Sequence, residues 1–184
     1  SQLLGSQNDM ATIRLRDTSA SHERCSVVEV MGRNCGEIAL WSGIATGADA
    51  IMIPEDAESQ SFDHLVRVIM ENRARGKNHN IIIVAEGVGH AEELAKRIHE
   101  VTGIETRATI LGHIQRGGRP TALDIKHASM MGYLAVEALY RGETNRVISV
   151  KDGKYVDQDI DEALAMTKEP SLDIWNANLH ISTY

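Results

Sequence analysis

The sequence predicts an α/β fold, in which a mostly parallel sheet is flanked by helices, and three observations support that class. From residue 25 onward, short apolar runs rich in β-branched residues alternate with helical patterns. The run Ile81-Ile82-Ile83-Val84 has no polar alternation, as expected of a strand that helices cover on both faces. Finally, 184 residues with 42% hydrophobic side chains can form one domain, or one and a part, around a sizeable core. We therefore expect a Rossmann-like arrangement of βαβ units.

The elements of that sheet are predicted in a regular order. Strands are expected at residues 25–30, 50–53, 81–85 and 106–111, with helices between them at 36–46, 61–75 and 91–102. Pro54 ends the second strand because proline has no backbone N–H to donate. In such sheets ligands bind beyond the carboxyl ends of the strands. The four strand exits are therefore the places where a site is expected.

A domain boundary is predicted at Pro120, between residues 13–120 and 121–184. Beyond it we expect a helix over 121–141, a hairpin of strands 146–150 and 154–156, a short helix over 160–166 and a tail containing Trp175. The long helix carries an apolar stripe of Ala128, Met131, Leu134, Ala135, Ala138 and Leu139. Residues 1–12 have no initiator methionine and no periodicity, and we interpret them as a cloning remnant or a loop. The chain is therefore expected to be a fragment.

The composition argues against several classes of partner. A formal net charge of -7 disfavours nonspecific binding to nucleic acid or to anionic membranes, because both need a surplus of clustered lysine and arginine. No apolar run is long enough for a membrane span or a signal peptide. Cys25 and Cys35 are too few for a disulfide framework and lack metal-ligand spacing. We expect them to be reduced, buried thiols of a cytoplasmic protein.

Positive charge is concentrated around the fourth predicted strand. Arg107 opens the strand, His113 and Arg116 follow its end, and Arg119 comes after the turn residues Gly117-Gly118. In a chain with more acids than bases, this concentration indicates a place where a phosphate or another anion could bind. Ordinary surface arginines around a turn are the alternative interpretation.

Two other strand exits carry groups that suit a ligand. The loop from Glu29 to Gly36 enters a helix, whose first N–H groups are expected to point toward a ligand while Arg33 binds a phosphoryl oxygen. A tight turn with an exposed arginine is the alternative. Glu86 opens a Glu-Gly-Val-Gly segment, but the dinucleotide-binding fingerprint fails because Glu92 replaces its third glycine. A carboxylate there suits a sugar hydroxyl, and a simple polar strand end is the alternative.

Two further clusters are less specific. Residues 16–24 are dense in hydroxyls and charge, and Arg75, Lys77 and His79 follow a helix end, where the helix dipole favours cations without any ligand. The sequence has no phosphate loop of the Gly-x-x-x-x-Gly-Lys type, no His-Glu-x-x-His and no nucleophile elbow. It also offers no persuasive nucleotide cradle, Mg²⁺ ligands or proton acceptor for phosphoryl transfer.

Taken together, these segments resemble bacterial-type 6-phosphofructokinases, and specifically their C-terminal portion. The resemblance runs from about Ile13 to the tail and is most specific in residues 16–18, 22–36, 54–55 and 105–118. It implies the C-terminal domain of the phosphofructokinase fold, with residues 13–120 binding fructose 6-phosphate and 121–184 packing on an ATP-binding domain. The family's ATP loop, magnesium-binding aspartate and catalytic base belong to an N-terminal half without a counterpart here. The chain alone is therefore expected to be inactive.

The resemblance also implies roles for single residues. The family transfers the γ-phosphoryl group of ATP to the 1-hydroxyl of fructose 6-phosphate with Mg²⁺, and Arg33 matches a catalytic arginine that stabilises the charge in transit. The positions that match substrate contacts are Arg24, Met31, Gly32, Arg33, Glu86, Arg107, His113 and Arg116. Of these, Arg24 and Arg107 match arginines that reach the phosphate from a neighbouring subunit. A homotetramer with shared sites is therefore implied.

A second set of positions is similar to the family's allosteric nucleotide site: Arg16, Asp49, Arg75, Lys77 and His79. ADP or another effector is the implied ligand, and Asp49 stands where a Mg²⁺-associated carboxylate is expected. The family often has glutamate at that position and lysine at position 75. Because arginine and lysine differ in donor geometry, the identity of the effector stays open. A pyrophosphate-dependent relative and a noncatalytic sugar-phosphate or nucleotide sensor are the alternative functions.

Overall fold

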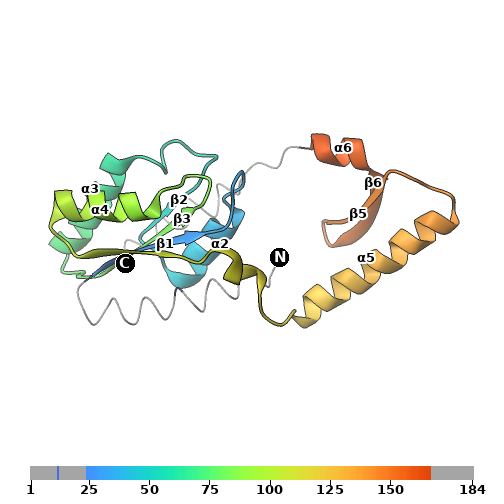
Figure 1. The fold of residues 1–184 in the computed structure, drawn as a ribbon, viewed down its shortest axis with the longest axis horizontal. Coiled ribbons are helices and arrows are strands. Elements are labelled where there is room, and N and C mark those ends of the chain that lie inside the picture. Colours follow the sequence, from blue (N-terminus) through green and yellow to red (C-terminus); the bar gives the residue numbers. More distant parts are fainter. Residues whose placement is uncertain (1–11, 13–23, 167–184) are drawn as a thin grey trace. The chain divides into compact units, whose positions relative to one another are not determined.

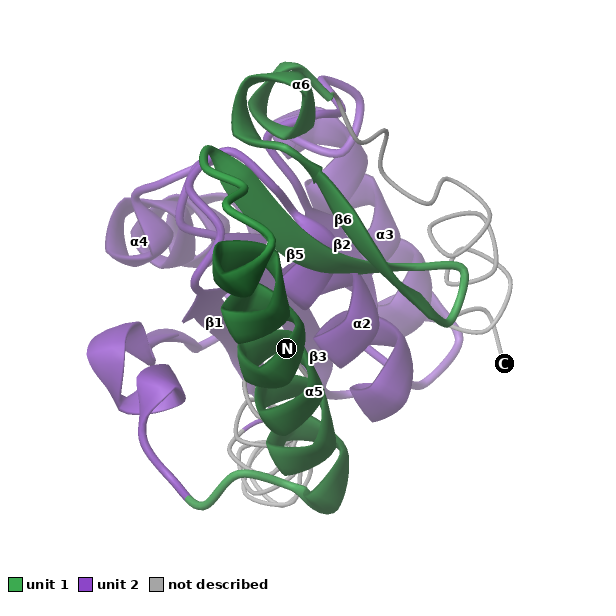
Figure 2. Ribbon diagram, turned by 90° about the vertical axis from the view of Figure 1, so that its right-hand side faces the viewer, with its two compact units in different colours: residues 1–3, 119–169 green, residues 4–118, 170–184 purple. Residues whose placement is uncertain are grey.

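The computed structural model describes Thr12 and residues 24–166 of the chain. These residues form two compact units: the first contains Thr12 and residues 24–118, and the second contains residues 119–166 (Figure 2). The division falls beside Pro120, where a proline and two glycines interrupt regular structure. The predicted N-terminal loop before Thr12, the allosteric candidate Arg16 and the tail with Trp175 lie outside the described residues.

Within residues 24–118, the first unit is a parallel sheet with helices on both faces (Figure 1). Its strands are β1 (Cys25–Val30), β2 (Ala50–Met52), β3 (Asn80–Ala85) and β4 (Thr106–Ile110), in the spatial order β2-β3-β1-β4. The connecting helices are α2 (Glu37–Thr46), α3 (Phe62–Ala74) and α4 (Ala91–Thr102). The predicted α/β class is confirmed. Because all pairs are parallel, the loops that follow the strands meet at one edge.

The core of this unit has two layers, one on each face of the sheet. Ile82 of β3 packs in a cluster with Leu65 of α3 and Ile98 of α4, whereas its neighbour Ile83 packs with Leu40 of α2. Successive side chains of a strand point to opposite faces, and both faces are covered here, so the strand is apolar throughout. Burying each of these side chains contributes about 1.5 to 3 kcal/mol to the stability of the fold.

The fourth strand ends one residue earlier than predicted and is followed by a short 3₁₀ helix, η1 (Gly112–Arg116). Gly112 has a φ of +52°, a conformation that glycine adopts without strain and that turns the chain out of the strand. The Leu111 N–H still donates to Glu29 O at 3.1 Å, so η1 begins against the end of β1. The predicted site residues His113 and Arg116 therefore lie in η1.

The second unit combines a long helix with a hairpin. Helix α5 (Ala122–Tyr140) precedes the antiparallel strands β5 (Arg146–Lys151) and β6 (Lys154–Asp159), and α6 (Ile160–Ala165) follows. The predicted hairpin is confirmed: Asp152 and Gly153 have φ of +50° and +74°, as a two-residue turn between twisted strands requires. His127 Nδ1 lies 3.0 Å from the Tyr155 hydroxyl, a contact that joins α5 to β6.

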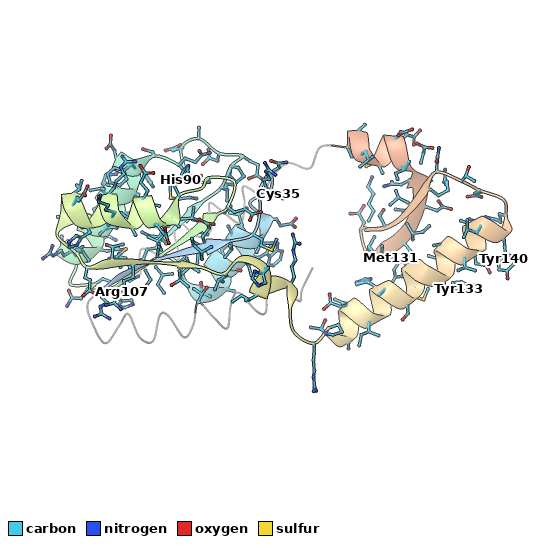
Figure 3. All side chains as sticks on the ribbon, viewed as in Figure 1. Cys35, His90, Arg107, Met131, Tyr133 and Tyr140 are labelled. Atoms are coloured by element: carbon cyan, nitrogen blue, oxygen red, sulfur yellow. The ribbon has the colours of Figure 1, made fainter. Side chains whose placement is uncertain are left out.

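The apolar stripe predicted for α5 is only partly buried. Ala138 is 3% exposed and Leu139 is 69% exposed, so the stripe has a buried side and an exposed side. Neighbouring residues lie about 100° apart around a helix, and the hairpin covers only one side. Tyr133 and Tyr140 lie on the side of α5 away from the hairpin, whereas Met131 lies on the hairpin side (Figure 3). Among the described residues, no helix has the length and apolar character needed to cross a membrane.

Candidate functional site

The loops that follow β1 and β3 lie against each other at the carboxyl edge of the sheet. The Glu86 N–H donates to Val30 O at 2.8 Å, and the Gly87 N–H donates to Gly32 O at 3.1 Å. A Cβ atom at Gly87 would collide with the backbone oxygen of Arg33, so only glycine lets the loops approach this closely. Arg33 and Glu86 therefore belong to adjoining loops, and both residues are exposed.

Gln115 joins the third loop to the first. Its Oε1 accepts from the Met31 N–H at 3.0 Å, and its Nε2 donates to Gly112 O at 3.0 Å. Gln115 is 1% exposed, whereas its neighbours His113 and Arg116 are exposed. Sequence reasoning did not single out Gln115, because a glutamine inside a polar loop gives no signal that it is buried. Its two bonds fix η1 against the residue that leads into Arg33.

We call residues 31–36, 86–90 and 111–118 the carboxyl-edge loops. They bring together six of the eight predicted substrate contacts: Met31, Gly32, Arg33, Glu86, His113 and Arg116. The set combines two arginines, a histidine and a carboxylate on adjoining exposed loops. Such a set suits an anion that also carries hydroxyl groups, because cations bind the charge and a carboxylate accepts from a hydroxyl. The individual roles of these residues stay predictions.

The residue before α2 has a partner within the chain. The Gly36 N–H donates to both oxygens of Glu55, at 2.8 and 2.9 Å, while the expectation that the first N–H groups of α2 face a ligand stays a prediction. A carboxylate at a helix N-terminus is favoured by the helix dipole, so the chain itself supplies the anion at Gly36. A Cβ atom on Gly36 would collide with Ile53, which explains the glycine. Glu55 thus connects the loop after β2 to the loop that carries Arg33.

The remaining two substrate candidates, Arg24 and Arg107, lie at the opposite edge of the sheet. Arg24 precedes β1, and Arg107 pairs with Ser26 near its beginning. From Ser26 to the end of β1, the strand covers roughly 13 Å. Figure 3 shows Arg107 and Cys35, a residue of the carboxyl-edge loops, at opposite ends of the sheet. Arg24 and Arg107 therefore do not join the carboxyl-edge loops of their own chain.

Glu105 holds these two arginines together. Arg24 Nε lies 3.0 Å from Glu105 Oε2, and Arg107 Nη2 lies 2.8 Å from Glu105 Oε1. The Arg24 and Arg107 guanidinium groups lower the pKa of the Glu105 carboxyl below its ordinary value. The amino edge of the sheet therefore presents two cations around one shared carboxylate. The Glu105 side chain is half exposed, so water screens these pairs strongly.

The predicted allosteric residues that the structure describes lie at the same amino edge. Asp49 precedes β2, and its side chain is 2% exposed. Asp49 Oδ1 accepts from Lys77 Nζ at 2.6 Å and from Asn72 Nδ2 at 2.7 Å, and Oδ2 accepts from the Ile81 N–H at 2.9 Å. Both oxygens of Asp49 thus bind groups of the chain itself. A role of Asp49 beside an effector's Mg²⁺ stays a prediction.

Of the predicted allosteric residues that the structure describes, only Lys77 lines a hollow at this edge. Arg75 follows the end of α3 and is exposed, while His79 is partly exposed just before β3. A hollow of about 190 Å³ at this edge is lined by residues that include Lys77, Asn80 and Glu105. Within residues 12 and 24–166, no group of three His, Cys, Asp or Glu side chains is arranged to hold a metal ion.

The two cysteines differ in environment. Both are free, as predicted, but the prediction that both are buried is wrong for Cys35, which is exposed in the loop after β1. Cys25 is fully buried at the start of β1. Burial, and secondly the negative charge of Asp49, raises the pKa of the Cys25 thiol to about 12.

Comparison with known proteins gives a consistent result. The ATP-dependent 6-phosphofructokinase of Clostridium acetobutylicum is 59% identical over 163 residues, which cover 89% of this chain and 50% of that protein. The enzyme of the same name from Clostridium botulinum strain Alaska E43 is 57% identical over 89% of this chain and 51% of its own length. The chain thus spans about half the length of the curated relatives that it matches.

Solved structures of phosphofructokinases are also similar to this chain. The phosphofructokinase of Saccharomyces cerevisiae has a TM-score of 0.81 at 34% identity, and the match covers 97% of this chain and 25% of that one. The Pichia pastoris phosphofructokinase in the T-state has a TM-score of 0.79 at 32% identity, over 98% of this chain and 22% of that one. The family profile described as Phosphofructokinase matches residues 9–139. By its sequence, its fold and these relatives, the chain belongs to the phosphofructokinase family.

Proposed function

We propose that the chain is the C-terminal part of an ATP-dependent 6-phosphofructokinase and carries most of its fructose 6-phosphate site. The whole enzyme would transfer the γ-phosphoryl group of ATP to the 1-hydroxyl of the sugar, a step of glycolysis. The observation that carries the proposal is the meeting of Arg33, Glu86, His113 and Arg116 on the carboxyl-edge loops. ATP is preferred over pyrophosphate as the donor because the curated relatives are named ATP-dependent enzymes.

In this proposal each side chain has a separate task at the sugar phosphate. His113 binds the 6-phosphate, Glu86 and Arg116 bind the sugar, and the backbone of Met31-Gly32 lies beside it. Each charge-assisted hydrogen bond contributes about 1.5 to 3 kcal/mol, so several of them explain selection of a phosphorylated sugar over a free one. Arg33 is the catalytic residue, because its guanidinium would stabilise the negative charge on the phosphoryl group in transit.

ATP, Mg²⁺ and the proton acceptor are assigned to the part of the enzyme outside this chain. When bound, Mg²⁺ neutralises the charge that builds up between the phosphates. On this assignment the isolated chain has no kinase activity. Measurable ATP-dependent turnover by the purified chain would contradict the assignment.

The site is proposed to be shared between two copies of the chain. Arg24 and Arg107 lie at the amino edge, roughly 13 Å of strand away from the carboxyl-edge loops, so they do not complete the site of their own chain. In an oligomer they would bind the phosphate held by a neighbouring copy, and the whole enzyme is proposed to be a tetramer. Glu105 keeps the two guanidinium groups side by side.

We assign the second set of residues to an allosteric nucleotide site, with ADP as the candidate effector. Arg75 and Lys77 supply cations at the amino edge, His79 supplies a ring nitrogen, and Arg16 would join them. Because Lys77 Nζ lies 2.6 Å from Asp49 Oδ1, the first task of Asp49 in this proposal is to hold the Lys77 ammonium group. We place the enzyme in the cytoplasm, with no role for nucleic acid or membranes.

The second unit is proposed to pack on the ATP-binding domain of the whole enzyme. Its helix α5 exposes Tyr133, Val136, Leu139 and Tyr140 by half or more. A row of large apolar side chains on one helix commonly marks a surface that another domain or copy covers. This proposal rests on the apolar character of that face.

Calorimetric titration with fructose 6-phosphate and with fructose tests the proposed site. We expect the chain to bind fructose 6-phosphate and to bind fructose at least tenfold more weakly, because the phosphate supplies the charge-assisted bonds. Arg33→Ala should weaken fructose 6-phosphate binding about tenfold. Arg67→Ala, which removes an exposed arginine on α3, serves as the matched control and should leave binding unchanged.

Mixing the chain with the N-terminal half of a relative distinguishes an enzyme part from a sensor. Recovered ATP-dependent turnover, lost again with Arg33→Ala, supports the enzyme. Tight fructose 6-phosphate binding without any recovered turnover would favour the noncatalytic sensor. Equal affinity for fructose and fructose 6-phosphate would contradict the proposed site itself.

A further inference from the structure

The carboxyl-edge loops are held together by one buried polar side chain that does not itself face a ligand. Gln115 is 1% exposed and is among the largest fully buried side chains of the described residues. Burying a carboxamide costs free energy unless its donor and acceptor are both used. Here both are used, by the Met31 N–H and by Gly112 O, each at 3.0 Å.

The orientation of the carboxamide follows from its partners. A backbone N–H must face the oxygen of the side chain, and a carbonyl oxygen must face the nitrogen. Asparagine and glutamine carry an acceptor and a donor on one planar amide, and asparagine is one methylene shorter. Glutamate lacks the donor, and methionine has the volume without either function. The site therefore depends on the amide and not only on a side chain of the right size.

The bond to Met31 joins two parts of the site, whereas the bond to Gly112 lies within η1 and fixes the Gln115 side chain there. Met31 directly precedes Gly32 and Arg33 in the loop after β1, and Gly112 opens the 3₁₀ helix that carries His113 and Arg116. A change in the Gln115 bonds would alter the distance between the Arg33 side and the His113 side of the site. Interactions with both ends of one ligand are sensitive to such changes, because a misplacement of about 1 Å can cost up to about 100-fold in rate.

We propose that Gln115 is a positioning residue that sets the spacing between Arg33 and the pair His113 and Arg116, without touching the substrate. The inference rests on the proposed function, because it assigns fructose 6-phosphate as the ligand that spans the two loops. Gln115 would affect substrate binding indirectly, through its bonds to Met31 and Gly112.

Two variants and one control distinguish the role of the Gln115 carboxamide from the role of its side-chain volume. Gln115→Met keeps the size and removes both bonds, whereas Gln115→Glu keeps the acceptor for Met31 and removes the donor for Gly112. Gln60→Glu makes the same charge change at an exposed glutamine of the same unit. We expect fructose 6-phosphate affinity to fall about tenfold or more in both Gln115 variants and less than twofold in the control.

A double-mutant cycle distinguishes positioning from general destabilisation. If Gln115 acts by placing His113, then Gln115→Met should weaken binding much less in a His113→Ala background than in the wild type, about threefold or less instead of tenfold. A purely structural effect would give the same fold-change in both backgrounds, and that result would overturn the proposal.

Amide hydrogen exchange tests the inference independently of the ligand. In Gln115→Met the Met31 amide should exchange at least tenfold faster, because its acceptor is gone, while Gln115→Glu should keep it protected. The Gly87 amide, bonded to Gly32 O, is the internal reference. If the wild-type chain bound no fructose 6-phosphate, the proposed function would fail, but Met31 exchange would still decide whether Gln115 holds the loops. Unchanged Met31 exchange in Gln115→Met would refute the inference.

Discussion

Gly87 shows how a residue without a side chain can define a site. The backbone oxygen of Arg33 occupies the place where a Cβ atom of residue 87 would lie. Because the obstacle is backbone, it cannot move aside like the end of a flexible side chain. We predict that Gly87→Ala separates the loops after β1 and β3, costs about 1 to 3 kcal/mol of stability and weakens fructose 6-phosphate binding at least tenfold. Urea denaturation and calorimetry measure the two effects.

Gly132→Ala is the matched control for that substitution. Gly132 lies inside α5, and a Cβ atom there would meet nothing within 4 Å. Alanine is a better helix former than glycine, so this variant should be as stable as the wild type or up to about 1 kcal/mol more stable. If Gly87→Ala bound the sugar phosphate as well as Gly132→Ala, the close approach of the loops would be irrelevant to the site.

The two cysteines should differ sharply in reactivity. Burial raises the pKa of Cys25 to about 12, so hardly any thiolate is present near neutral pH, and reagents cannot reach the sulfur. Cys35 is exposed. We predict that iodoacetamide adds one group to the native chain, at Cys35, and a second only after denaturation. Peptide mass spectrometry locates the adducts, and native labelling of Cys25 would contradict the packing of β1.

At the scale of elements, α5 begins with a reciprocal cap. The Thr121 hydroxyl accepts from the Asp124 N–H at 3.2 Å, and Asp124 Oδ2 accepts from the Thr121 N–H at 3.0 Å and from its hydroxyl at 2.7 Å. Thr121→Ala removes the side-chain half of this capping box. We predict a loss of about 1 kcal/mol in the stability of the second unit, measured by urea denaturation.

The pH dependence of the cap has a defined sign. Hydrogen bonds from Thr121 lower the pKa of Asp124 below its ordinary value of 3.8. The folded state therefore favours the carboxylate. The contribution of Asp124 to the stability of the fold is present above pH 3.8 and is lost as the pH falls through the lowered pKa. In that pH window, Thr121→Ala should lose less stability than the wild type. Circular dichroism during acid titration measures the difference. Identical acid profiles would mean that the cap does not form in solution.

The sequence predicted the elements better than the contacts between their loops. Helix α3 was expected over 61–75 and is found at Phe62–Ala74, because periodicity and the Ser61 cap are local signals. Parallel strand order then places Arg33, Glu86 and His113 at one edge without knowledge of any contact. The bond from Met31 to Gln115 joins residues 84 positions apart, and the bond from Gly36 to Glu55 joins residues 19 apart. No local pattern encodes such pairs, so the roles of Gln115 and Glu55 were not foreseen.

At the scale of the whole molecule, the exposed face of α5 has a measurable consequence. Tyr133 is 58% exposed, Leu139 69% and Tyr140 85%. We predict that the chain binds an apolar dye or self-associates, because such a face is unfavourable in water. Tyr133→Glu with Leu139→Glu should reduce dye binding and association in light scattering. Lys126→Glu, at an exposed polar position of α5, should not. A monomeric wild-type chain without dye binding would contradict the proposed covered surface.

The proposed sharing of the sugar-phosphate site between copies leads to the most specific prediction. Arg33→Ala damages the carboxyl-edge loops and leaves Arg107 intact, whereas Arg107→Ala damages the amino edge and leaves Arg33 intact. When the two variants are assembled together in equal amounts with the N-terminal half, some sites combine an intact Arg33 from one copy with an intact Arg107 from another. For pairwise sharing, about a quarter of the sites should be complete.

Assembly of Arg33→Ala with Arg116→Ala is the control, because both substitutions lie on the carboxyl-edge loops. Whichever copies meet, each carboxyl edge then lacks one of its two arginines, so no complete site can form and turnover should stay near that of the single variants. The difference between the two mixtures isolates the sharing of edges from any general effect of mixing. Equal turnover in both mixtures would show that Arg107 does not act in a neighbour's site, and the separation of the arginines between the two edges would then need another explanation.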